Sequence, residues 1–306
     1  MTKIIGGSNG KKIAIDLSLK LGIEYIDASI TKFRDNEISV QLPKSLYQKD
    51  IIIVQSTSNP VNDNLMELLL LIDAAKRLGS SQIIAVIPYF GYGRQDKTSA
   101  EFGLVAARLV ANMLETAGIN NLITMDLHSK QIEGAFNIGI QNIEPISLFS
   151  SDLSDLLDPS LDTVVVSPDI GGLFRAKKFA DMLKSELVVI NKTRNSNNSC
   201  EMNGMIGTVT GKNCIIIDDI IDSGSTLTQA SILLRQHGAI SINAIVTHSI
   251  LAESAKEKIA QSPIDSILTT NSIPQKLDNT KFKIRDITPM VAEAMGKFIG
   301  LRLQNI

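Results

Sequence analysis

Residues 214–227 read CIIIDDIIDSGSTL, an apolar run that leads into three acids and then a turn of small, hydroxyl-bearing residues. Residues 214–218 show no polar alternation, as expected for a strand covered on both faces of a parallel sheet. Residues 225–237 then carry apolar positions at helical spacing, and Gly238 is suited to end a helix. The stretch therefore predicts a strand, a loop and a helix, the repeating unit of α/β folds.

The same unit recurs along the chain. Apolar runs that read as further buried strands cover residues 51–54, 83–87, 122–124, 163–167, 187–190 and 242–248. Apolar residues also repeat at helical spacing after Asp63, a predicted N-cap, and again over residues 103–117. This alternation predicts an α/β protein with mainly parallel sheets, flanked by helices and joined by right-handed crossovers.

The length of 306 residues favours two domains, at roughly 150 residues per domain. Residues 142–160, which include two prolines and several serines, interrupt the alternation of strands and helices before it restarts. We therefore predict domains at residues 1–145 and 146–306. Each half has a strand followed by a polar loop and a later strand that ends in an acid, which indicates a duplicated fold.

The composition excludes several classes of protein. The chain carries 30 basic and 32 acidic residues, and this balance argues against general nucleic-acid binding. No apolar run reaches about 18 residues, so we expect no membrane span. Cys200 and Cys214 fit neither a disulfide framework nor a metal knuckle, which favours reduced thiols. Because the N-terminal MTKIIGGSNG also lacks a signal-peptide core, we expect a cytoplasmic protein.

A small polar turn opens the helix predicted at residues 225–237. It consists of Ser223, Gly224, Ser225 and Thr226. Open α/β sheets bind ligands beyond the carboxyl ends of their strands, and a helix N-terminus there offers N–H groups and a partial positive charge. Gly224 lets the backbone approach a ligand closely, while the neighbouring hydroxyls add donors. The turn therefore predicts an anion cradle, most naturally for phosphate.

Three acids precede that turn. Asp218, Asp219 and Asp222 would repel a phosphate, but they can accept hydrogen bonds from sugar hydroxyls. A ligand with a phosphate at one end and a diol at the other suits both parts of the loop, so we predict a pentose 5-phosphate. An ordinary helix cap beside solvated acids is the simpler alternative, and three acids directly after a buried strand disfavour it.

Two common nucleotide-binding motifs are absent from the sequence. In the segment most similar to a P-loop, Ile206 replaces the first glycine and Asn213 replaces the final Ser or Thr. GYGRQD, residues 91–96, lacks the third glycine of the dinucleotide motif because Asp96 stands there. A P-loop kinase and a dinucleotide enzyme are therefore both disfavoured.

Residues 214–227 resemble the ribose-phosphate loop of type I phosphoribosyltransferase folds. Five further segments resemble ribose-phosphate pyrophosphokinases (phosphoribosyl pyrophosphate synthetases), in that family's order: KFRDNE (32–37), QSTSNPVNDNLMEL (55–68), PYFGYGRQDK (88–97), DLHSKQIEGAF (126–136) and VVVSPDIGGLFRAKKFAD (164–181). The resemblance covers nearly the whole chain. It implies two similar phosphoribosyltransferase-like domains, the N-terminal one binding ATP and the C-terminal one binding ribose 5-phosphate.

The resemblance assigns most ATP contacts to the first half. These residues are Phe33, Asp35, Glu37, Arg94, Gln95, Asp96, Lys97 and His128. The charges of Arg94 and Lys97 can neutralise a polyphosphate, and the ring of Phe33 offers stacking area to adenine. In the family, the segment around Phe33 reads the adenine of a neighbouring subunit. A homo-oligomer, hexameric or dimer-based, with a shared ATP site is therefore implied.

The resemblance also implies Mg²⁺ and a pyrophosphate loop. Asp169 follows a strand and offers the oxygen ligand that Mg²⁺ prefers, and His128 is implied to contact the metal and the ATP phosphates. Gly171 and Gly172 would let a pyrophosphate group lie against backbone N–H groups.

The implied reaction transfers the diphosphoryl group of ATP to the C1 hydroxyl of ribose 5-phosphate, giving phosphoribosyl pyrophosphate and AMP. Lys192 and Arg194, in a polar segment expected to form a mobile loop at residues 191–204, resemble the family's catalytic lysine and arginine. Two alternatives stay open. Asn191 and Thr193 replace charged residues that are usual there, which allows a catalytically weak regulatory subunit. A phosphoribosyltransferase would explain the ribose-phosphate loop but not the ATP segments.

Overall fold

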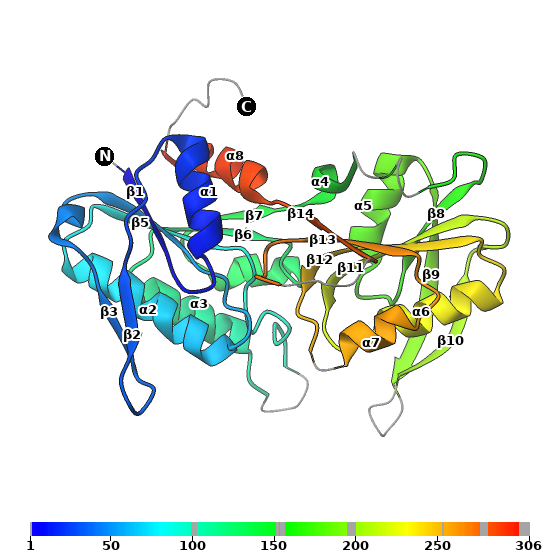
Figure 1. Ribbon diagram of the computed structural model, residues 1–306. Coiled ribbons are helices and arrows are strands. Elements are labelled where there is room, and N and C mark those ends of the chain that lie inside the picture. The colour runs from blue at the N-terminus through cyan, green and yellow to red at the C-terminus, as the bar shows by residue number, and fades with distance from the viewer. Residues whose placement is uncertain are drawn as a thin grey trace. The chain divides into compact units, whose positions relative to one another are not determined.

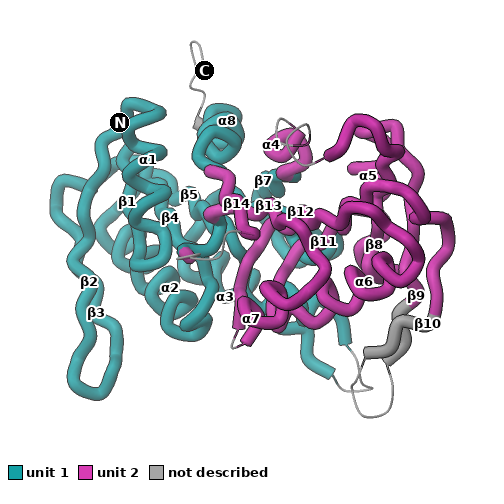
Figure 2. The backbone as a smooth tube through the Cα atoms, turned by 45° about the vertical axis from the view of Figure 1, so that its right-hand side comes forward, with its two compact units in different colours: residues 1–144, 272–274, 287–306 teal, residues 145–271, 275–286 magenta. Residues whose placement is uncertain are grey.

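The computed structural model describes residues 2–98, 103–150, 153, 157–194, 200–252, 254–275 and 281–299. They form two compact units, drawn in different colours in Figure 2. The first unit runs to Glu144 and includes residues 272–274 and the C-terminal segment from Ile287. The second unit consists of residues 145–271 and 275–286.

The first unit is built on a parallel sheet with the strand order β1-β4-β5-β6-β7 (Figure 1). Its strands are β1 (Thr2–Gly6), β4 (Asp50–Val54), β5 (Gln82–Ile87), β6 (Asn121–Met125) and β7 (Gly139–Ile143). Its helices are α1 (Lys11–Leu21), α2 (Val61–Arg77), α3 (Ala106–Ala117), α8 (Thr288–Ile299), η1 (Lys44–Leu46) and η2 (Lys130–Ala135). An antiparallel ribbon of β2 (Ser29–Lys32) and β3 (Ile38–Gln41) follows α1.

The strands of this sheet carry apolar side chains on both faces, and helices cover both faces. Alternate residues of β4 point to opposite faces, so Ile51 and Ile53 pack with residues of α2 and α3 while Ile52 faces the other side. On that other side, α1 and α8 lie next to each other (Figure 1). Runs such as DIIIV therefore read as continuous apolar segments, as the sequence predicts.

The second unit has the strand order β10-β9-β8-β11-β12-β13-β14, in which only β10 is antiparallel to its neighbour. The strands are β8 (Thr163–Ser167), β9 (Glu186–Arg194), β10 (Cys200–Ile206), β11 (Asn213–Ile221), β12 (Ser241–Ser249), β13 (Ser266–Thr270) and β14 (Phe282–Arg285). The helices are α4 (Ile146–Ser150), α5 (Leu173–Leu183), α6 (Ser225–Gln236) and α7 (Ala255–Ala260). Val164 and Val166 pack with α6 and α7, and Val165 packs with α5 on the opposite face.

The two units repeat one chain path. β1, β4, β5, β6 and β7 lie in sheet order as β8, β11, β12, β13 and β14 do. In each unit a helix follows the first of these strands, an antiparallel ribbon comes next, and two further helices separate the following three strands. This repetition confirms the prediction of two similar α/β domains.

The C-terminal helix departs from the predicted domain limits. The prediction assigned all of residues 146–306 to the second domain, but α8 packs against α1, β6 and β7 and belongs to the first unit. The helix buries Val291, Ala292 and Met295, which supply apolar cover for that face of the first sheet. A composition break near residue 145 carries no information about a later return of the chain.

The expected loop at residues 191–204 is a second difference. β9 continues to Arg194 and pairs antiparallel with β10, so that Lys192 lies opposite Met202 and Arg194 opposite Cys200. Backbone hydrogen bonds of a ribbon require no apolar side chains, so the apolar run at residues 187–190 predicted only the first part of β9, and the polar composition gave no signal for the rest of β9 or for β10.

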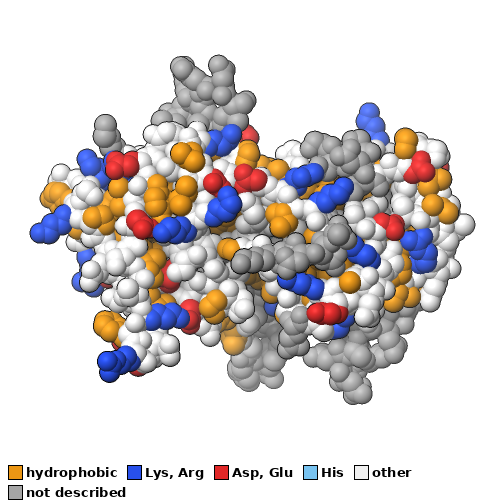
Figure 3. Space-filling view, viewed as in Figure 1, with side chains coloured by type: hydrophobic (Ala, Val, Ile, Leu, Met, Phe, Trp, Pro, Cys, Tyr) orange, Lys and Arg blue, Asp and Glu red, His pale blue; other side chains and the backbone are white. Residues whose placement is uncertain are grey.

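The surface of the described residues agrees with the balanced composition. On the face drawn in Figure 3, basic and acidic side chains are interspersed rather than gathered into one patch. None of the helices in the described ranges combines the length and apolar character needed to cross a membrane.

Candidate active site

The acids of residues 214–227 lie near the carboxyl end of β11, the central strand of the second sheet. β11 runs on to Ile221, so Asp218 and Asp219 lie within the strand rather than past its end. The strand continues because its pairing with β12 extends as far as Ile221. Asp219 is buried, and Asp222 is the first residue after the strand.

The turn after β11 leads directly into α6. Gly224 has a φ of 73°, the left-handed conformation that glycine adopts without strain. The hydroxyl of Ser223 donates to the hydroxyl of Ser225 at 3.1 Å and accepts the N–H of Ser225 at 3.4 Å. Hydroxyls and the positive end of a helix are thus combined directly after Asp222, in an arrangement that attracts an anion.

Carboxylates from the ends of β8 and β11 gather beside Arg175 of α5. Nη1 of Arg175 lies 3.7 Å from Oδ1 of Asp219, and the N–H of Asp219 donates to Oδ1 of Asp218 at 2.9 Å. Burial raises the pKa of Asp218 well above its ordinary value, and the charges of Asp219 and Asp169 raise it further. Arg175 opposes this shift. The cluster is therefore rich in negative charge and suited to hydroxyl donors or a cation.

The loop between β8 and α5 holds Asp169, Gly171 and Gly172. Oδ1 of Asp169 accepts the N–H of Gly172 at 3.0 Å, and the Asp169 carbonyl accepts the hydroxyl of Ser167 at 2.7 Å. β8 and β11 are adjacent parallel strands, so their following loops meet at one edge of the sheet. Asp169 therefore lies near Asp218, and its charge acts on the Asp218 carboxyl.

A divalent cation suits this cluster chemically. Its donors are carboxylate oxygens, which Mg²⁺ prefers, and a cation would offset the repulsion that Asp219 and Asp169 exert on Asp218. Within the described ranges, no group of three or more His, Cys, Asp or Glu side chains is arranged to hold a metal by itself. Mg²⁺ commonly combines one or two carboxylates with water and substrate phosphates. The residues present therefore fit a Mg²⁺ ion that takes its remaining ligands from water and from a phosphate group.

In the first unit, the predicted phosphate-binding segment forms the loop from β5 to α3. It carries Arg94, Gln95, Asp96 and Lys97, of which all but the half-buried Asp96 are exposed. The carboxylate of Asp96 accepts a hydrogen bond from Nε2 of Gln131 at 2.7 Å. The carbonyl of Gln95 accepts the N–H of Ala107 at 3.2 Å. These contacts attach the loop to η2 and α3.

His128 lies on the neighbouring loop, after β6. β5 and β6 are adjacent parallel strands, so the His128 loop and residues 94–97 lie at the same edge of the first sheet. The His128 side chain is exposed, and Asp126 before it has a φ of 41°. Asp169, the other predicted metal ligand, belongs to the second unit.

Phe33, Asp35 and Glu37 occupy the tip of the β2–β3 ribbon. The N–H of Phe33 donates to the carbonyl of Glu37 at 2.8 Å, and the N–H of Glu37 donates to Oδ1 of Asp35 at 3.2 Å. Phe33 is 61% exposed. The tip therefore presents a ring and two carboxylates to solvent.

Two predicted residues and one unpredicted residue remain. The backbone of Lys192 and Arg194 lies in β9, whereas their side chains fall outside the described part of the structure. Arg175 is not among the residues predicted from the sequence. Its signal was a basic residue in the first turn of a helix that opens after two glycines, and only the fold shows that it reaches Asp219.

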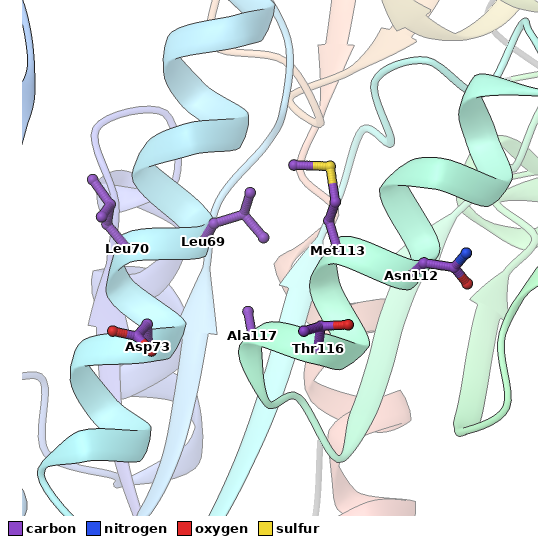
Figure 4. Close-up of a pocket in the computed structure, with 7 residues that line it drawn as sticks. All are labelled: Leu69, Leu70, Asp73, Asn112, Met113, Thr116 and Ala117. Carbon is purple, nitrogen blue, oxygen red and sulfur yellow. The ribbon is translucent and has the colours of Figure 1, made fainter.

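An apolar groove between α2 and α3 is separate from these loops. Its lining, drawn in Figure 4, consists of Leu69, Leu70, Asp73, Asn112, Met113, Thr116 and Ala117. These residues come from the C-terminal halves of both helices, and therefore lie away from the helix starts that follow the strand ends. The groove belongs to neither predicted substrate site.

Family models match both parts of the chain. Residues 2–118 match the model described as the N-terminal domain of ribose phosphate pyrophosphokinase. Residues 198–300 match the phosphoribosyl synthetase-associated domain.

Individual proteins match over nearly the full length. The ribose-phosphate pyrophosphokinase of Wolinella succinogenes is 41% identical over 293 residues, which cover 96% of this chain and 94% of that protein. The ribose-phosphate pyrophosphokinase of Listeria ivanovii is 41% identical over 297 residues, covering 96% and 92% respectively. The crystal structure of phosphoribosylpyrophosphate synthetase from Mycobacterium smegmatis superposes with a TM-score of 0.91 at 32% identity, covering 98% of this chain and 99% of that one.

Proposed function

Because this chain belongs to the ribose-phosphate pyrophosphokinase family, we propose that it transfers the diphosphoryl group of ATP to the C1 hydroxyl of ribose 5-phosphate. The products are phosphoribosyl pyrophosphate and AMP. One observation carries the proposal. The chain carries three acids and a hydroxyl-rich turn at Asp218 to Thr226 in the second unit, and a loop with the cations Arg94 and Lys97 in the duplicate of that unit.

We assign the second unit to ribose 5-phosphate. The turn from Ser223 to Thr226 and the start of α6 hold the phosphate through N–H groups and hydroxyls. Asp218, Asp219 and Asp222 accept hydrogen bonds from the ribose hydroxyls. Backbone N–H groups at Gly171 and Gly172, together with Asp169, form the loop for the pyrophosphate group. The closeness of Asp169 to Asp218 supports this assignment.

We assign the first unit to ATP. Arg94, Gln95, Asp96 and Lys97 bind the nucleotide with His128, which lies at the same edge of the sheet. Phe33, Asp35 and Glu37, at their exposed ribbon tip, bind adenine in a neighbouring subunit. The proposal therefore includes a homo-oligomer, hexameric or dimer-based. It also includes a cytoplasmic location, where ATP is abundant and thiols stay reduced.

The transfer itself needs little covalent chemistry from the protein. The C1 oxygen bonds to the β-phosphorus, and the bond from that phosphorus to the α,β-bridging oxygen breaks. AMP leaves with that oxygen, and the proton of the C1 hydroxyl passes to solvent. Lys192 and Arg194 neutralise charge on the transferring group. Asp169 in the second unit and His128 in the first would each offer a ligand to Mg²⁺, which would supply further charge neutralisation when bound.

The test is to incubate the purified protein with ATP, Mg²⁺ and ribose 5-phosphate and to separate AMP from ADP. AMP that forms only with the sugar phosphate supports the proposal. ADP as the product would indicate transfer of a single phosphoryl group. Absence of turnover with retained ribose 5-phosphate binding would favour a regulatory subunit or a phosphoribosyltransferase.

A further inference from the structure

A buried carboxylate in the first unit, that of Glu67 on α2, has no part in the substrate contacts assigned above. Glu67 is 5% exposed. Its Oε1 accepts the N–H of Ser8 at 2.6 Å and Nε2 of Gln55 at 2.9 Å, and its Oε2 accepts the hydroxyl of Ser8 at 2.6 Å. One carboxylate thus joins α2 to the β1–α1 loop and to the residue that follows β4.

The duplicated fold identifies the residue of the second unit that is equivalent to Gln55. β4 begins at Asp50 and β11 at Asn213, and each first residue pairs with the first residue of the preceding parallel strand. Gln55 and Asp218, five residues further along in each case, therefore occupy equivalent positions. The second unit therefore has two acids, Asp218 and Asp219, where the first unit has Gln55 and Ser56. In the first unit, Oε1 of Gln55 accepts the N–H of Asn9 at 2.9 Å, and Glu67 accepts the preceding N–H.

The same network fixes the segment that follows β4. Nε2 of Gln55 also contacts Oδ1 of Asn64 at 3.3 Å, and Nδ2 of Asn64 donates to the carbonyl of Ser58 at 2.8 Å. Nδ2 of Asn9 donates to the hydroxyl of Ser58 at 3.1 Å. Residues 55–58 are buried throughout. The segment is therefore attached on one side to α2 and on the other to the β1–α1 loop.

Residues 56 and 57 in turn hold the start of the loop that carries Arg94 to Lys97. Oγ1 of Thr57 accepts the N–H of Gly91 at 2.7 Å and donates to the carbonyl of Tyr89 at 3.1 Å. The N–H of Thr57 donates to the same carbonyl at 3.0 Å. The two segments touch so closely that a methyl group on Gly91 would lie 2.4 Å from the carbonyl oxygen of Thr57. A shift of residues 55–58 must therefore move the loop.

We propose that Glu67 is a positioning residue for ATP, acting through Gln55 and Thr57 on the loop at residues 91–97. This inference rests on the proposed function, since that function assigns ATP to Arg94 to Lys97. Glu67→Gln leaves one amide oxygen for the N–H of Ser8 and Nε2 of Gln55, removes the acceptor of the Ser8 hydroxyl, and replaces charge-assisted hydrogen bonds by weaker neutral ones. The loop at residues 91–97 then shifts from its wild-type position. The second unit, which carries the residues assigned to ribose 5-phosphate, is unaffected.

The test compares Glu67→Gln with Asp73→Asn, a matched control. Asp73 lies on the same helix and loses the same charge, but its carboxylate pairs with Arg77 at the surface. We expect faster amide hydrogen exchange at residues 89–97 in Glu67→Gln only. We also expect its KM for ATP to rise about tenfold while its KM for ribose 5-phosphate stays within about twofold. Asp73→Asn should match the wild type in all three measurements.

A second variant covers the case in which Glu67→Gln does not fold. Thr57→Val removes only the hydroxyl that accepts the N–H of Gly91, in a side chain of similar shape, and should give the same split between the two KM values. Unchanged exchange at residues 89–97, or equal rises in both KM values, overturns the positioning role. If the wild type forms no AMP, the proposed function fails, while the exchange comparison still decides the role of Glu67.

Discussion

Substituting Gly224 by alanine tests whether the start of α6 holds the sugar phosphate. Gly224 has a φ of 73°, where an L-residue costs roughly 1–2 kcal/mol. A methyl group there would also lie 3.3 Å from the backbone oxygen of Ala255 and 3.3 Å from Cγ1 of Ile259. Because the first of these atoms belongs to backbone, the turn between β11 and α6 must give way.

Gly211 provides a matched control in the same unit. Its φ is 75°, and among the residues that the structure describes no heavy atom lies within 4 Å of the place that a methyl group on Gly211 would occupy. Gly211→Ala therefore carries the backbone cost alone. We expect both variants to lose about 1–2 kcal/mol in free energy of unfolding, with the larger loss in Gly224→Ala, and Tm to fall by about 2–4 °C per kcal/mol.

The assay is AMP formation at a temperature where circular dichroism shows both variants folded. Displacement of the turn should raise the KM for ribose 5-phosphate about tenfold in Gly224→Ala, with the KM for ATP unchanged. Gly211→Ala should leave both KM values at the wild-type level. The same KM for ribose 5-phosphate in both variants would refute the assignment of the α6 start to the phosphate, because the two differ only in their surroundings.

Four further predictions concern single side chains. Asp222→Ala should lower the equilibrium binding affinity for ribose 5-phosphate and leave the affinity for ATP unchanged. An equal loss of affinity for both substrates would contradict their division between the units. Lys192→Ala should lower kcat by about 10²–10³ with little change in either KM, and an unchanged kcat would remove it from the mechanism. Burial raises the pKa of Cys214 to about 12, so in a Cys200→Ser background an aromatic disulfide reagent at pH 8 should react only after unfolding. Burial and a hydrogen bond to the Asp27 carboxylate raise the pKa of Tyr25 to about 12. The stability that this shift contributes is therefore complete below pH 10 and is lost between pH 10 and 12. In Tyr25→Phe, the free energy of unfolding from denaturant titrations should fall less over that pH range.

The strands with the strongest signal are those buried on both faces. IIIV at residues 51–54 and CIIID at 214–218 read as continuous apolar runs because helices cover both sides of each sheet. The end of β9 gave no such signal, since its polar residues 191–194 pair with β10 through backbone groups. The apolar pattern also stops short at Asp218, whereas β11 continues because β12 offers a partner up to Ile221. Local pattern detects burial, but it does not detect pairing.

The candidate site shows the same limit. Asp218, Asp219 and the turn at Gly224 are adjacent in sequence, so one stretch was enough to predict a sugar-phosphate loop. Arg175 reaches Asp219 only because β8 and β11 are neighbours in the sheet. Glu67 reads as one polar position in an amphipathic helix, and its partners lie far from it in the chain. Residues that act through tertiary contacts leave no local pattern.

The duplicated fold explains why the two units have different chemistry on one chain path. At equivalent positions along the second strand of each path, the second unit has Asp218 within β11, whose pKa is raised by burial and by neighbouring acids, and the first unit has Gln55 directly after β4. Burying several acids together costs free energy unless a ligand or a cation neutralises them, so the acids around Asp218 are suited to bind one. In the first unit, Glu67 and Gln55 already accept the N–H groups of Ser8 and Asn9, which fixes the β1–α1 loop without a ligand. The hydrogen bonds of Thr57 then hold the next loop along the sheet, so the proposed sites follow β11 in the second unit and β5, the strand equivalent to β12, in the first.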